Sequence, residues 1–408
     1  MHTETLTPAT LSSELRPLVE PGPSLTDEQA LRYSRNLSLG EVGSLGQRRF
    51  ANARVLSIGA GGLGSPALLY LAAAGVGIAG RGKLGVIDHD VVEQTNLQRQ
   101  IIHTEASVGE PKTQSAAARI RALNPHVRMT QHTEQLTPAN AAQIFAEYDL
   151  VIDGSDNFPT RYLVADAATL THTPYIWGSI LGFRGQISTF WDAAPGGRAR
   201  TYRDLYPAPP PVGSVPSCVE AGVLGVICGV IGSLMGLEAL KLIAGIGKPL
   251  LGKLLLFDGA QMLWQTVTFN ADSNRPPVLS LAVGSSDINS AEPDAGSDIG
   301  LAAVVGISPR KLAQLLTEST DLLLLDVRQD YERQIVDIAG SLHIAHTDVL
   351  DGSVQVPRDK PIVVFCKAGP RSELVADYLR DHGYGDVDVL AGGVLAWVQQ
   401  IDHSGTMY

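Results

Sequence analysis

Residues 54–64 read RVLSIGAGGLG, a short apolar run that passes into a cluster of glycines. Its valine, leucine and isoleucine favour a strand that is buried in a parallel sheet. The glycines from 59 to 64 have the spacing G-x-G-x-x-G, and residues 65–74 are typical of a helix. In a strand–turn–helix unit of this kind, backbone N–H groups and the helix N-terminus hold phosphate. The stretch therefore predicts a nucleotide site, with a tight strand-to-helix turn as the simpler alternative.

The alternation of strands and helices continues along the chain. Further strands are predicted at 84–88, at 149–153 and within 175–191, and further helices at 25–50, 111–123 and 159–171. This order predicts an α/β fold with a doubly wound, largely parallel, Rossmann-like sheet. A smaller α/β unit follows, with predicted strands at 322–327 and 362–365 and predicted helices at 308–317 and 372–382.

Composition divides the chain into four parts. The stretch 1–25 is rich in Pro, Ser and Glu, which is typical of a flexible arm. The stretch 271–300 is polar and rich in Ser, Asp, Pro and Gly, which is typical of a linker. The nucleotide-binding domain is therefore expected at 26–270 and the second domain at 301–408. A chain of 408 residues, of which 44% are apolar, is long enough for two cores.

Charge and cysteine content limit the partners and the compartment. The net charge of −11 argues against a direct nucleic-acid partner. The three cysteines, Cys218, Cys228 and Cys366, are too few for a disulfide framework. They suit a reducing, cytoplasmic setting in which one or two thiols react. The first residues include acidic side chains and lack an apolar core, so they do not resemble a secretory signal.

The stretch from 221 to 237 raises the question of a membrane span. It carries no charged residue and lies between Glu220 and Glu238. Its glycines recur at alternating steps of three and four residues, which places them on one helix face where another backbone can approach closely. Its length is at the lower limit for crossing a bilayer. We therefore expect a buried core or dimer-interface helix, with Cys228 in the core, and no membrane association.

Charged residues follow the predicted strands at the edge where open α/β sheets bind ligands. Asp88 ends the second strand, where an acidic residue binds ribose hydroxyls. Arg99 and Lys112 come next, and cations beside a phosphate site neutralise charge on phosphorus and on departing pyrophosphate. Asp156 follows the strand at 149–153, where a carboxylate can hold Mg²⁺ on phosphate oxygens. Each residue alone is consistent with a solvated surface position. Together they favour nucleoside triphosphate chemistry over an NAD-dependent oxidoreductase.

Between residues 31 and 269 the chain resembles the MoeB/ThiF family, the bacterial relatives of ubiquitin-activating enzymes. The motifs that carry the resemblance occur in the family's order: RYSRN, GAGGLGSP, IDHDVVEQTNLQRQ, VGEPKTQSA, DLVIDGSDNFPTRY, GQISTF and CVEAGVLGVICGVIGSLMGLEALK. The family binds ATP with Mg²⁺ and adenylates the C-terminal glycine of a small ubiquitin-like sulfur carrier that ends in Gly-Gly. The resemblance also implies a homodimer.

The same resemblance implies a set of site residues. Those at the nucleotide, its phosphates and Mg²⁺ are Gly62, Asp88, Thr95, Asn96, Leu97, Gln98, Arg99, Lys112, Asp156 and Asn157. Arg35 would act in the ATP site of the neighbouring subunit. Cys218 matches the family's loop cysteine, which in some members forms a thioester or a persulfide link to the carrier.

Two features depart from the family pattern. Many members hold a structural zinc with two cysteine pairs, whereas Thr201 and Asp204 stand in the segment of the first pair. Three cysteines cannot supply four ligands, so we predict no zinc. The segment 77–85, GIAGRGKLG, is longer than the family's turn. It fits a phosphate-binding P-loop only as far as Lys83, because Leu84 replaces the Mg²⁺-binding Ser or Thr.

The second domain carries a reactive-cysteine pattern after an apolar strand. Its loop consists of Cys366, Lys367, Ala368, Gly369, Pro370 and Arg371, and a helix is expected from Ser372. Such a loop points N–H groups at the sulfur and precedes a helix N-terminus, and both favour a thiolate or an anionic persulfide. A buried inert thiol is the simpler alternative.

From 307 to 397 this domain resembles rhodanese, a sulfurtransferase. The motifs LLLLDVR, with Asp326 and Arg328, and LAGGVLAW add to the resemblance. Tyrosine-phosphatase loops hold one more residue between the cysteine and the arginine, so the shorter loop favours sulfur over phosphate.

The two resemblances together imply one reaction sequence. The first domain forms an acyl-adenylate on the carrier, and a persulfide on Cys366 converts it to a thiocarboxylate. Thiosulfate or the persulfide of a cysteine desulfurase would supply the sulfur. The combination resembles adenylyltransferase/sulfurtransferases of the MoeZ type, which implies molybdenum cofactor biosynthesis, with thiamine, cysteine or tRNA thiolation as alternatives. A non-catalytic scaffold that only docks carriers is a further alternative, but it would not need the charged residues or Cys366.

Overall fold

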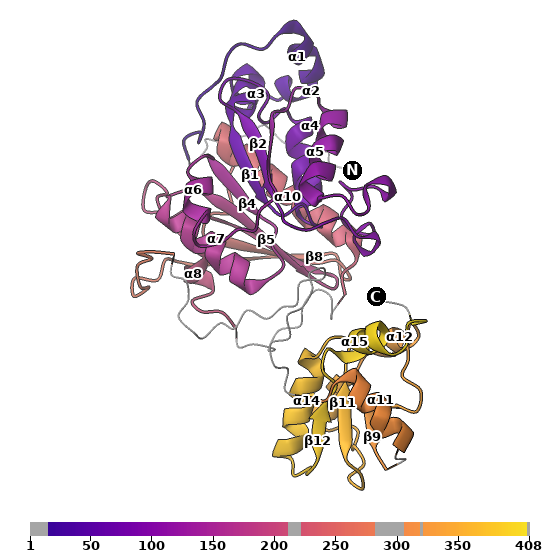
Figure 1. Ribbon diagram of the computed structural model, residues 1–408. Helices are drawn as coiled ribbons and strands as arrows, with labels where there is room; N and C mark the ends of the chain where they lie inside the picture. The colour runs from indigo at the N-terminus through magenta and orange to yellow at the C-terminus, as the bar shows by residue number, and fades with distance from the viewer. Residues whose placement is uncertain (1–14, 211–221, 282–305, 319–320, 406–408) are drawn as a thin grey trace, which may run out of the picture. The chain divides into compact units, whose positions relative to one another are not determined.

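The computed structural model describes residues 15–210, 222–281, 306–318 and 321–405. These residues form two compact units, the first ending at residue 281 and the second beginning at residue 306 (Figure 1). The polar stretch expected to be a linker is described as far as residue 281, and up to that point it contains no helix or strand.

An eight-stranded sheet forms the centre of the first unit. In spatial order its strands are β3 (Met129–His132), β2 (Lys83–Ile87), β1 (Arg54–Ile58), β4 (Leu150–Asp153), β5 (Tyr175–Leu181), β6 (Arg184–Phe190), β7 (Lys253–Asp258) and β8 (Leu263–Thr268). The strands from β3 to β5 run parallel, and those from β5 to β8 are antiparallel. The predicted α/β fold is confirmed. The strand order reverses between β1 and β4, which is where open α/β sheets bind ligands.

Helices cover both faces of this sheet (Figure 1). They are α1 (Asp27–Arg32), α2 (Ser34–Leu37), α3 (Gly43–Asn52), α4 (Gly64–Ala73), α5 (Lys112–Leu123), α6 (Ala141–Phe145), α7 (Phe158–Leu170), α8 (Tyr202–Leu205) and α10 (Gly225–Ala244). The single helical segment expected at 25–50 is three helices, and Gly43, with a φ of +49°, begins the last of them. The strands β3 and β8 and the helices α6 and α8 were not predicted, because each is short and shows no clear apolar periodicity.

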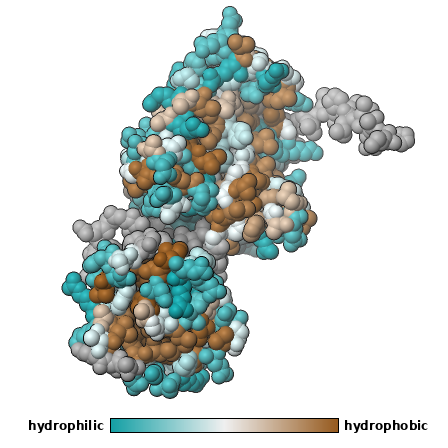
Figure 2. Space-filling view, turned by 90° about the vertical axis from the view of Figure 1, so that its right-hand side faces the viewer, coloured by the Kyte–Doolittle hydropathy of each residue, from teal (hydrophilic) through white to brown (hydrophobic). Residues whose placement is uncertain are grey.

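Apolar side chains are exposed on three helices of the first unit. Leu45 of α3, Tyr70 of α4 and Leu237 of α10 are 54%, 61% and 50% exposed, and both α3 and α4 pack on α10. Figure 2 views the side on which α4, α5 and α10 lie in Figure 1, and it shows apolar patches among hydrophilic side chains on the first unit. This face of the unit is therefore not a uniformly polar surface.

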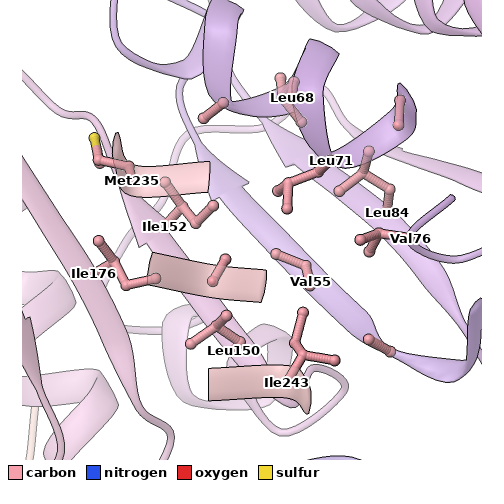
Figure 3. Close-up of a cluster of buried hydrophobic side chains, with 14 of the residues drawn as sticks. Val55, Leu68, Leu71, Val76, Leu84, Leu150, Ile152, Ile176, Met235 and Ile243 are labelled. Atoms are coloured by element: carbon pink, nitrogen blue, oxygen red, sulfur yellow. The ribbon is translucent and has the colours of Figure 1, made fainter. Parts of the chain in front are cut away.

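Two apolar cores lie between the helices and the sheet. Figure 3 shows the first, in which Leu68 and Leu71 of α4 and Met235 and Ile243 of α10 lie over Val55, Leu84, Leu150, Ile152 and Ile176 of the strands. The second core lies on the other face, with side chains from α6, α7 and α8, and it contains Leu56 and Val151. Successive residues of β1 and β4 thus enter different cores, as expected for strands that are buried on both faces.

Most of the apolar stretch expected at 221–237 lies in α10, which begins at Gly225 and continues beyond the uncharged residues to Ala244. Glu238 lies inside the helix and is buried, and its carboxylate accepts hydrogen bonds from Thr189 Oγ1 at 3.1 Å and from Leu250 N at 2.7 Å. Among the described residues, α10 is the one helix long and apolar enough to cross a membrane, but 56% of its most apolar window is buried in the first unit. It is a core helix of this unit.

A glycine of α10 allows the helix to approach α4 closely. A Cβ atom at Gly232 would overlap the carbonyl oxygen of Leu63 and the ring of Pro66. A Cβ atom at Gly229 would have no heavy atom within 4 Å. The predicted close approach is therefore confirmed at Gly232, but not at Gly229, which was expected on the same face. The contact of Gly232 is the first turn of α4, directly after the glycine turn.

The second unit has a four-stranded parallel sheet. Its strands, in spatial order, are β10 (Leu342–His343), β9 (Leu323–Asp326), β11 (Ile362–Phe365) and β12 (Val387–Val389). Its helices are α11 (Pro309–Glu318), α12 (Asp330–Arg333), α13 (His346–Leu350), α14 (Pro370–Asp381) and α15 (Gly393–Gln400). The strands and helices predicted for this unit correspond to β9, β11, α11 and α14. The shorter elements were not predicted.

Replacing Gly232 by alanine should destabilise the first unit, whereas Gly229→Ala should not. The methyl group at 232 has no space, and overpacking of this kind costs about 1–3 kcal/mol. At 229 the methyl group enters open space, and helix propensity favours alanine by about 1 kcal/mol. Urea unfolding of the full-length protein, followed by circular dichroism, compares the two variants. Equal stability of both would contradict the packing of α10 on α4.

Candidate active sites

Three parallel strands bring predicted nucleotide residues to one edge of the first sheet. The end of β1 lies beside the ends of β2 and β4, since Ile58 is paired with Ile87 and with Asp153. The glycine turn follows β1, while Asp88 and Asp156 follow β2 and β4. Because all three strands end at the same level, the turn and the two acidic residues share this edge.

Asp88 holds the glycine turn in place. Its Oδ2 accepts the Ala60 N–H at 2.8 Å, and its Oδ1 accepts the Asp90 N–H at 3.0 Å. Burial raises the pKa of the Asp88 carboxyl, and Lys112 opposes that shift. Each carboxylate oxygen keeps a lone pair for a hydroxyl donor, so the side chain can bind the turn and a ribose at the same time.

Lys112 is the first residue of α5 and is buried. Its Nζ lies 2.7 Å from Oδ2 of Asp90, two residues after Asp88. Sequence reasoning missed Asp90, although the motif IDHD places this second acidic residue just after the strand. The ion pair holds the lysine close to Asp88 without any phosphate.

The segment TNLQRQ begins in the 3₁₀ turn η1 (Gln94–Asn96). Asn96 is buried, and its Oδ1 accepts the Glu93 N–H at 3.1 Å, which fixes the start of the segment. The other candidate residues of this segment before Arg99 are exposed or half-buried: Thr95, Leu97 and Gln98. Their side chains are therefore accessible to a ligand at this edge.

Arg99 lies across the glycine turn. Its guanidinium donates to the Thr95 carbonyl at 3.0 Å. A Cβ atom at Gly62 would lie 3.6 Å from Arg99 Cγ and 2.8 Å from Cys228 Sγ of α10. Gly62 is thus enclosed between the arginine and α10, where a side chain would not fit. Cys228 is fully buried, as expected for a core residue.

Asp156 and Asn157 follow β4 and have different surroundings. Asp156 is exposed and makes no hydrogen bond or ion pair with the part of the chain that the structure describes. Its carboxylate suits a Mg²⁺ ion, because hard oxygen ligands are what Mg²⁺ prefers. The Oδ1 of Asn157 accepts the Thr160 N–H at 2.9 Å, so this side chain already serves as the N-cap of α7.

Two further candidates stand apart from these contacts. Arg35 is exposed on α2, and it makes no hydrogen bond or ion pair with the described residues. Cys218 lies outside the described residues. The proposed roles of both stay predictions.

In the segment 77–85, residues 77–82 form a turn between α4 and β2, and residues 83–85 begin β2. Gly77 has a φ of +78°, and a Cβ atom there would lie 2.8 Å from the Lys83 carbonyl carbon. Lys83 begins β2, and its Nζ pairs with Glu147 at 2.6 Å. Because a strand rather than a helix follows the lysine, the segment is not a P-loop.

A polar cluster occupies the segment in which family members carry the first cysteine pair of a zinc site. The Asp204 carboxylate accepts the Thr201 N–H at 2.7 Å and the Asp272 N–H at 3.0 Å. Arg275 lies 3.3 Å from the same carboxylate and also donates to the Thr201 hydroxyl. These residues do not fit a zinc ion, because a guanidinium repels a cation and none of the described cysteines takes part.

Cys366 directly follows β11 and is buried. Its Sγ accepts the Gly369 N–H at 3.1 Å, and the Ser372 hydroxyl lies 3.5 Å away. Gly369 has a φ of +136°, which favours glycine. The helix α14 begins at Pro370, two residues earlier than expected, so the last two loop residues belong to the helix. One backbone N–H and a helix N-terminus therefore lie close to the sulfur.

Two buried ion pairs support this loop. Arg371 makes a bidentate pair with Glu332 of α12, at 2.6 and 2.8 Å. Arg328 and Asp326, both fully buried, pair at 2.6 Å. Burial acts to raise the pKa of Glu332, but Arg371, the Gln329 N–H and Arg328 outweigh it, so this pKa lies below its ordinary value. The bidentate pair therefore ties the first turn of α14 to α12.

The motif LAGGVLAW closes the loop from the other side. Val394 N donates to the Cys366 carbonyl at 2.9 Å, and Leu395 N donates to the Lys367 carbonyl at 3.1 Å. Gly393 has a φ of +59°, and a Cβ atom there would lie 2.6 Å from the Cys366 carbonyl oxygen. Lys367 and Ala368 are half-buried between these contacts. The start of α15 thus fixes the backbone that carries the cysteine.

Comparison with known proteins extends over both units. The ThiF family matches residues 33–277, and the rhodanese-like domain matches residues 308–400. The probable adenylyltransferase/sulfurtransferase MoeZ of Mycobacterium tuberculosis is 46% identical over 400 residues, which cover 98% of this chain and 100% of that protein. Adenylyltransferase and sulfurtransferase MOCS3 of Sus scrofa is 38% identical and covers 95% of this chain and 90% of that protein. The sulfur carrier protein adenylyltransferase of Thermus thermophilus is 49% identical over 252 residues, 62% of this chain and 91% of that protein.

Solved structures agree on the fold of the first unit. E. coli MccB bound to MccA-N7isoASN has a TM-score of 0.52 at 20% identity, over 59% of this chain and 72% of that one. PaaA has a TM-score of 0.51 at 21% identity, over 61% of this chain and 76% of that one. Identities this low support the fold alone.

Purified protein should contain no stoichiometric zinc, because the cluster of Asp204 and Arg275 has no place for a cation. Elemental analysis after dialysis against a chelator measures the metal content. One zinc per chain that survives dialysis would contradict this prediction.

Arg275→Met should lower the stability of the first unit by about 3–5 kcal/mol, since it leaves a buried carboxylate without its cation.

Glu332→Gln should destabilise the second unit by about 3–5 kcal/mol and remove part of its acid sensitivity. The folded-state pKa of Glu332 lies below its ordinary value of 4.5, so between these two values the unfolded state binds more protons. The contribution of Glu332 to stability is therefore present above pH 4.5 and is lost as the pH falls through the folded-state pKa. Calorimetry across the acid range measures how the stability of each variant changes with pH. Glu373→Gln, on the exposed side of α14, is the control. Parallel pH profiles of the wild type and Glu332→Gln would contradict the prediction.

Proposed function

The chain belongs to the ThiF family, with a rhodanese-like domain after its ThiF domain, and from that premise we propose that it activates a sulfur-carrier protein with ATP and then passes sulfur to it. The broader activity follows from its full-length relatives: it is an adenylyltransferase and sulfurtransferase of the MoeZ and MOCS3 type. The proposal adds the substrate, the residues and the order of steps. A related adenylyltransferase is named for a sulfur-carrier protein, which supports this choice of substrate.

The arrangement at the sheet edge is the observation that carries the proposal. In the first step, a carboxylate oxygen of the carrier's C-terminal glycine attacks the α-phosphorus of ATP, and pyrophosphate leaves. Asp88 would bind the ribose, and Lys112 and Arg99 would neutralise charge on the phosphates. Asp156 would hold Mg²⁺, which supplies further positive charge to the phosphate oxygens. Adenylation needs these groups at one strand edge, and a hydride transfer does not.

The second step would use the Cys366 loop. The terminal sulfur of a Cys366 persulfide attacks the carbonyl of the acyl-adenylate, and AMP leaves. A thiol then attacks the Cys366 sulfur, which releases the thiocarboxylate and leaves a disulfide that cellular thiols reduce. Cys218 is the proposed thiol. The Gly369 N–H and the N-terminus of α14 support this role, because both stabilise negative charge on sulfur.

Other readings of the two sites have less support. Phosphate binding by the Cys366 loop would need a free arginine, but both ends of the Arg371 guanidinium are bound by Glu332. An NAD-dependent oxidoreductase or a non-catalytic scaffold would agree with the glycine turn alone. Neither agrees with relatives that are named adenylyltransferase and sulfurtransferase over the full chain.

A homodimer is part of the proposal. The exposed apolar side chains of α3, α4 and α10 would be covered in a dimer, as expected for a patch that a polar surface does not explain. Arg35, exposed on α2, would then be available to the ATP site of the neighbouring subunit.

The pathway and the compartment belong to the proposal too. We favour molybdenum cofactor biosynthesis in the cytoplasm, with thiosulfate or a cysteine desulfurase as the sulfur donor. Thiamine, cysteine or tRNA thiolation would use the same chemistry. Capture of small proteins that end in Gly-Gly, followed by mass spectrometry, identifies the carrier and separates these pathways.

Cys366→Ala should separate the two activities. The variant should keep ATP–pyrophosphate exchange, because the thiol takes no part in adenylation. It should lose thiosulfate:cyanide sulfur transfer and most thiocarboxylate formation with a persulfide donor. Cys218→Ala is the matched control, and it should keep thiosulfate:cyanide transfer. Mass spectrometry of the carrier C-terminus detects the replacement of oxygen by sulfur. Thiocarboxylate formed at the parent rate by Cys366→Ala would refute the sulfur relay.

Arg35 and Asp156 should act in one shared site. Asp156→Ala should lose exchange by at least ~100-fold, as expected when a metal ligand is removed from an electrostatically stabilised transfer. Mixing inactive Arg35→Ala and Asp156→Ala subunits should restore part of the activity, because some mixed dimers regain one intact site. Native mass spectrometry verifies that subunits exchange. No recovery after proven exchange would count against a shared site.

A further inference from the structure

Both backbone polar groups of Ala60, the second residue of the glycine turn, are bound by side chains. Its N–H donates to Asp88 at 2.8 Å, and its carbonyl lies 3.0 Å from Nε2 of His103. Nδ1 of the same ring lies 2.9 Å from Oγ of Ser115. His103 is 5% exposed, so these contacts lie inside the protein. The reaction proposed above does not use this buried histidine.

The partners of His103 determine which nitrogen carries the proton. A carbonyl oxygen only accepts hydrogen bonds, so Nε2 must be the donor to Ala60. Burial lowers the pKa of His103 to about 4, with Lys112 adding to this shift and the Ala60 carbonyl opposing it. The ring is therefore neutral near physiological pH, and Nδ1 accepts the Ser115 hydroxyl.

These two hydrogen bonds connect the glycine turn to the helix that carries Lys112. Ser115 lies three residues after Lys112 on α5, and residues at this spacing share a helix face. From the same segment as His103, Gln100 and Arg99 lie against the turn, 3.7 and 3.6 Å from Cβ positions at Gly61 and Gly62. The connection from turn to helix is therefore short and buried.

We propose that His103 is a positioning residue for adenylation, and that it sets the position of Lys112 relative to the glycine turn. The turn holds the nucleotide and Lys112 neutralises its phosphates, so a change in their spacing weakens both contacts together. His103 acts through Ala60 and Ser115 and is not a catalytic residue. The inference rests on the proposed role of Lys112.

The hydrogen bonds, and not the bulk of the ring, carry this role. His103→Leu fills similar space, but it leaves the Ala60 carbonyl with only the Ser65 hydroxyl, at 3.3 Å, and the Ser115 hydroxyl without its acceptor. In His103→Gln the side-chain amide can donate to the carbonyl, and its oxygen can accept from the hydroxyl. The leucine variant should therefore lose the coupling between the glycine turn and Lys112, and the glutamine variant should keep most of it.

A double-mutant cycle tests the proposal on the full-length protein, with ATP and Mg²⁺ as the probe and calorimetric titration as the readout. In the wild-type background, Lys112→Met should raise the Kd for ATP by about 30-fold, as for loss of a charge-assisted contact. In the His103→Leu background the same change should raise it by less than about 5-fold, because the lysine is already misplaced. In the His103→Gln background the effect of Lys112→Met should return to nearly its full size.

His132→Leu is the matched control. The ring of His132 contacts Tyr148, 2.9 Å from its hydroxyl, so this variant should leave the effect of Lys112→Met unchanged. If His103→Leu does not fold, Ser115→Ala takes its place in the cycle with the same expected coupling. Equal effects of Lys112→Met in the wild-type and leucine backgrounds would overturn the inference and leave the proposed function intact. If Lys112→Met has no effect in the wild-type background, both the inference and the proposed role of Lys112 in adenylation are overturned.

Discussion

The close packing around the glycine turn is the constraint on which the first unit depends. A Cβ atom at Gly62 would meet Cys228 of α10 on one side and Arg99 on the other. One at Gly64 would overlap the Gly59 carbonyl oxygen, and one at Gly232 of α10 would overlap the Leu63 carbonyl oxygen. The turn, the start of α4, the face of α10 and the segment with Arg99 therefore fit together in one arrangement. The same contacts that make the core place the glycine turn, where phosphate binding is proposed, beside the guanidinium of Arg99.

Much of the fold was predictable because the central strands are buried on both faces. The runs around Val55, Leu84 and Val151 are largely apolar, and they form β1, β2 and β4. The strands β3 and β8 lie at the two edges of the sheet, where less of each strand is buried. Their sequences therefore lack a largely apolar pattern, and both strands were missed. The helical stretch before β1 was predicted, but the breaks within it depend on local turns such as that at Gly43.

The candidate site was predictable where a single residue follows a strand, and not where a partner comes from far along the chain. Asp88 and Asp156 were found because parallel strands end at a common edge. Asp90, His103 and Glu332 were missed, and their partners Lys112, Ala60 and Arg371 are 22, 43 and 39 residues away. Sequence spacing does not reveal such pairs. Only the folded structure shows that Asp90, His103 and Glu332 hold Lys112, the glycine turn and Arg371.

Both units use a similar arrangement where an anion site is proposed. A strand ends, glycine allows an unusual backbone conformation, and a helix begins with its N-terminus close to the bend, at Gly59 before α4 and at Gly369 before α14. In each case a buried or half-buried carboxylate fixes a neighbouring group: Asp88 binds the turn itself, and Glu332 binds Arg371 of the helix. The charge left for a substrate differs, however. At the first site, Lys112 is paired with Asp90, but Arg99 donates to the Thr95 carbonyl and makes no ion pair with the described residues. At the second, the arginine is neutralised, and the sulfur receives the Gly369 N–H, the Ser372 hydroxyl and the helix dipole, which suit a single negative charge.

The charge balance at the first sheet edge gives a physical reason for the proposed use of Mg²⁺. The edge carries the carboxylates of Asp88, Asp90 and Asp156 beside the cations of Arg99 and Lys112. The ammonium of Lys112 is already paired with Asp90 at 2.7 Å. A phosphate that approaches this lysine therefore meets a carboxylate on the same ammonium, and the repulsion between the two anions opposes binding. A divalent cation carried by the phosphates removes this repulsion and can use the unpaired Asp156 carboxylate as a ligand. The ion would therefore compensate charge as ATP binds. For this role the protein does not have to provide a complete metal site in advance.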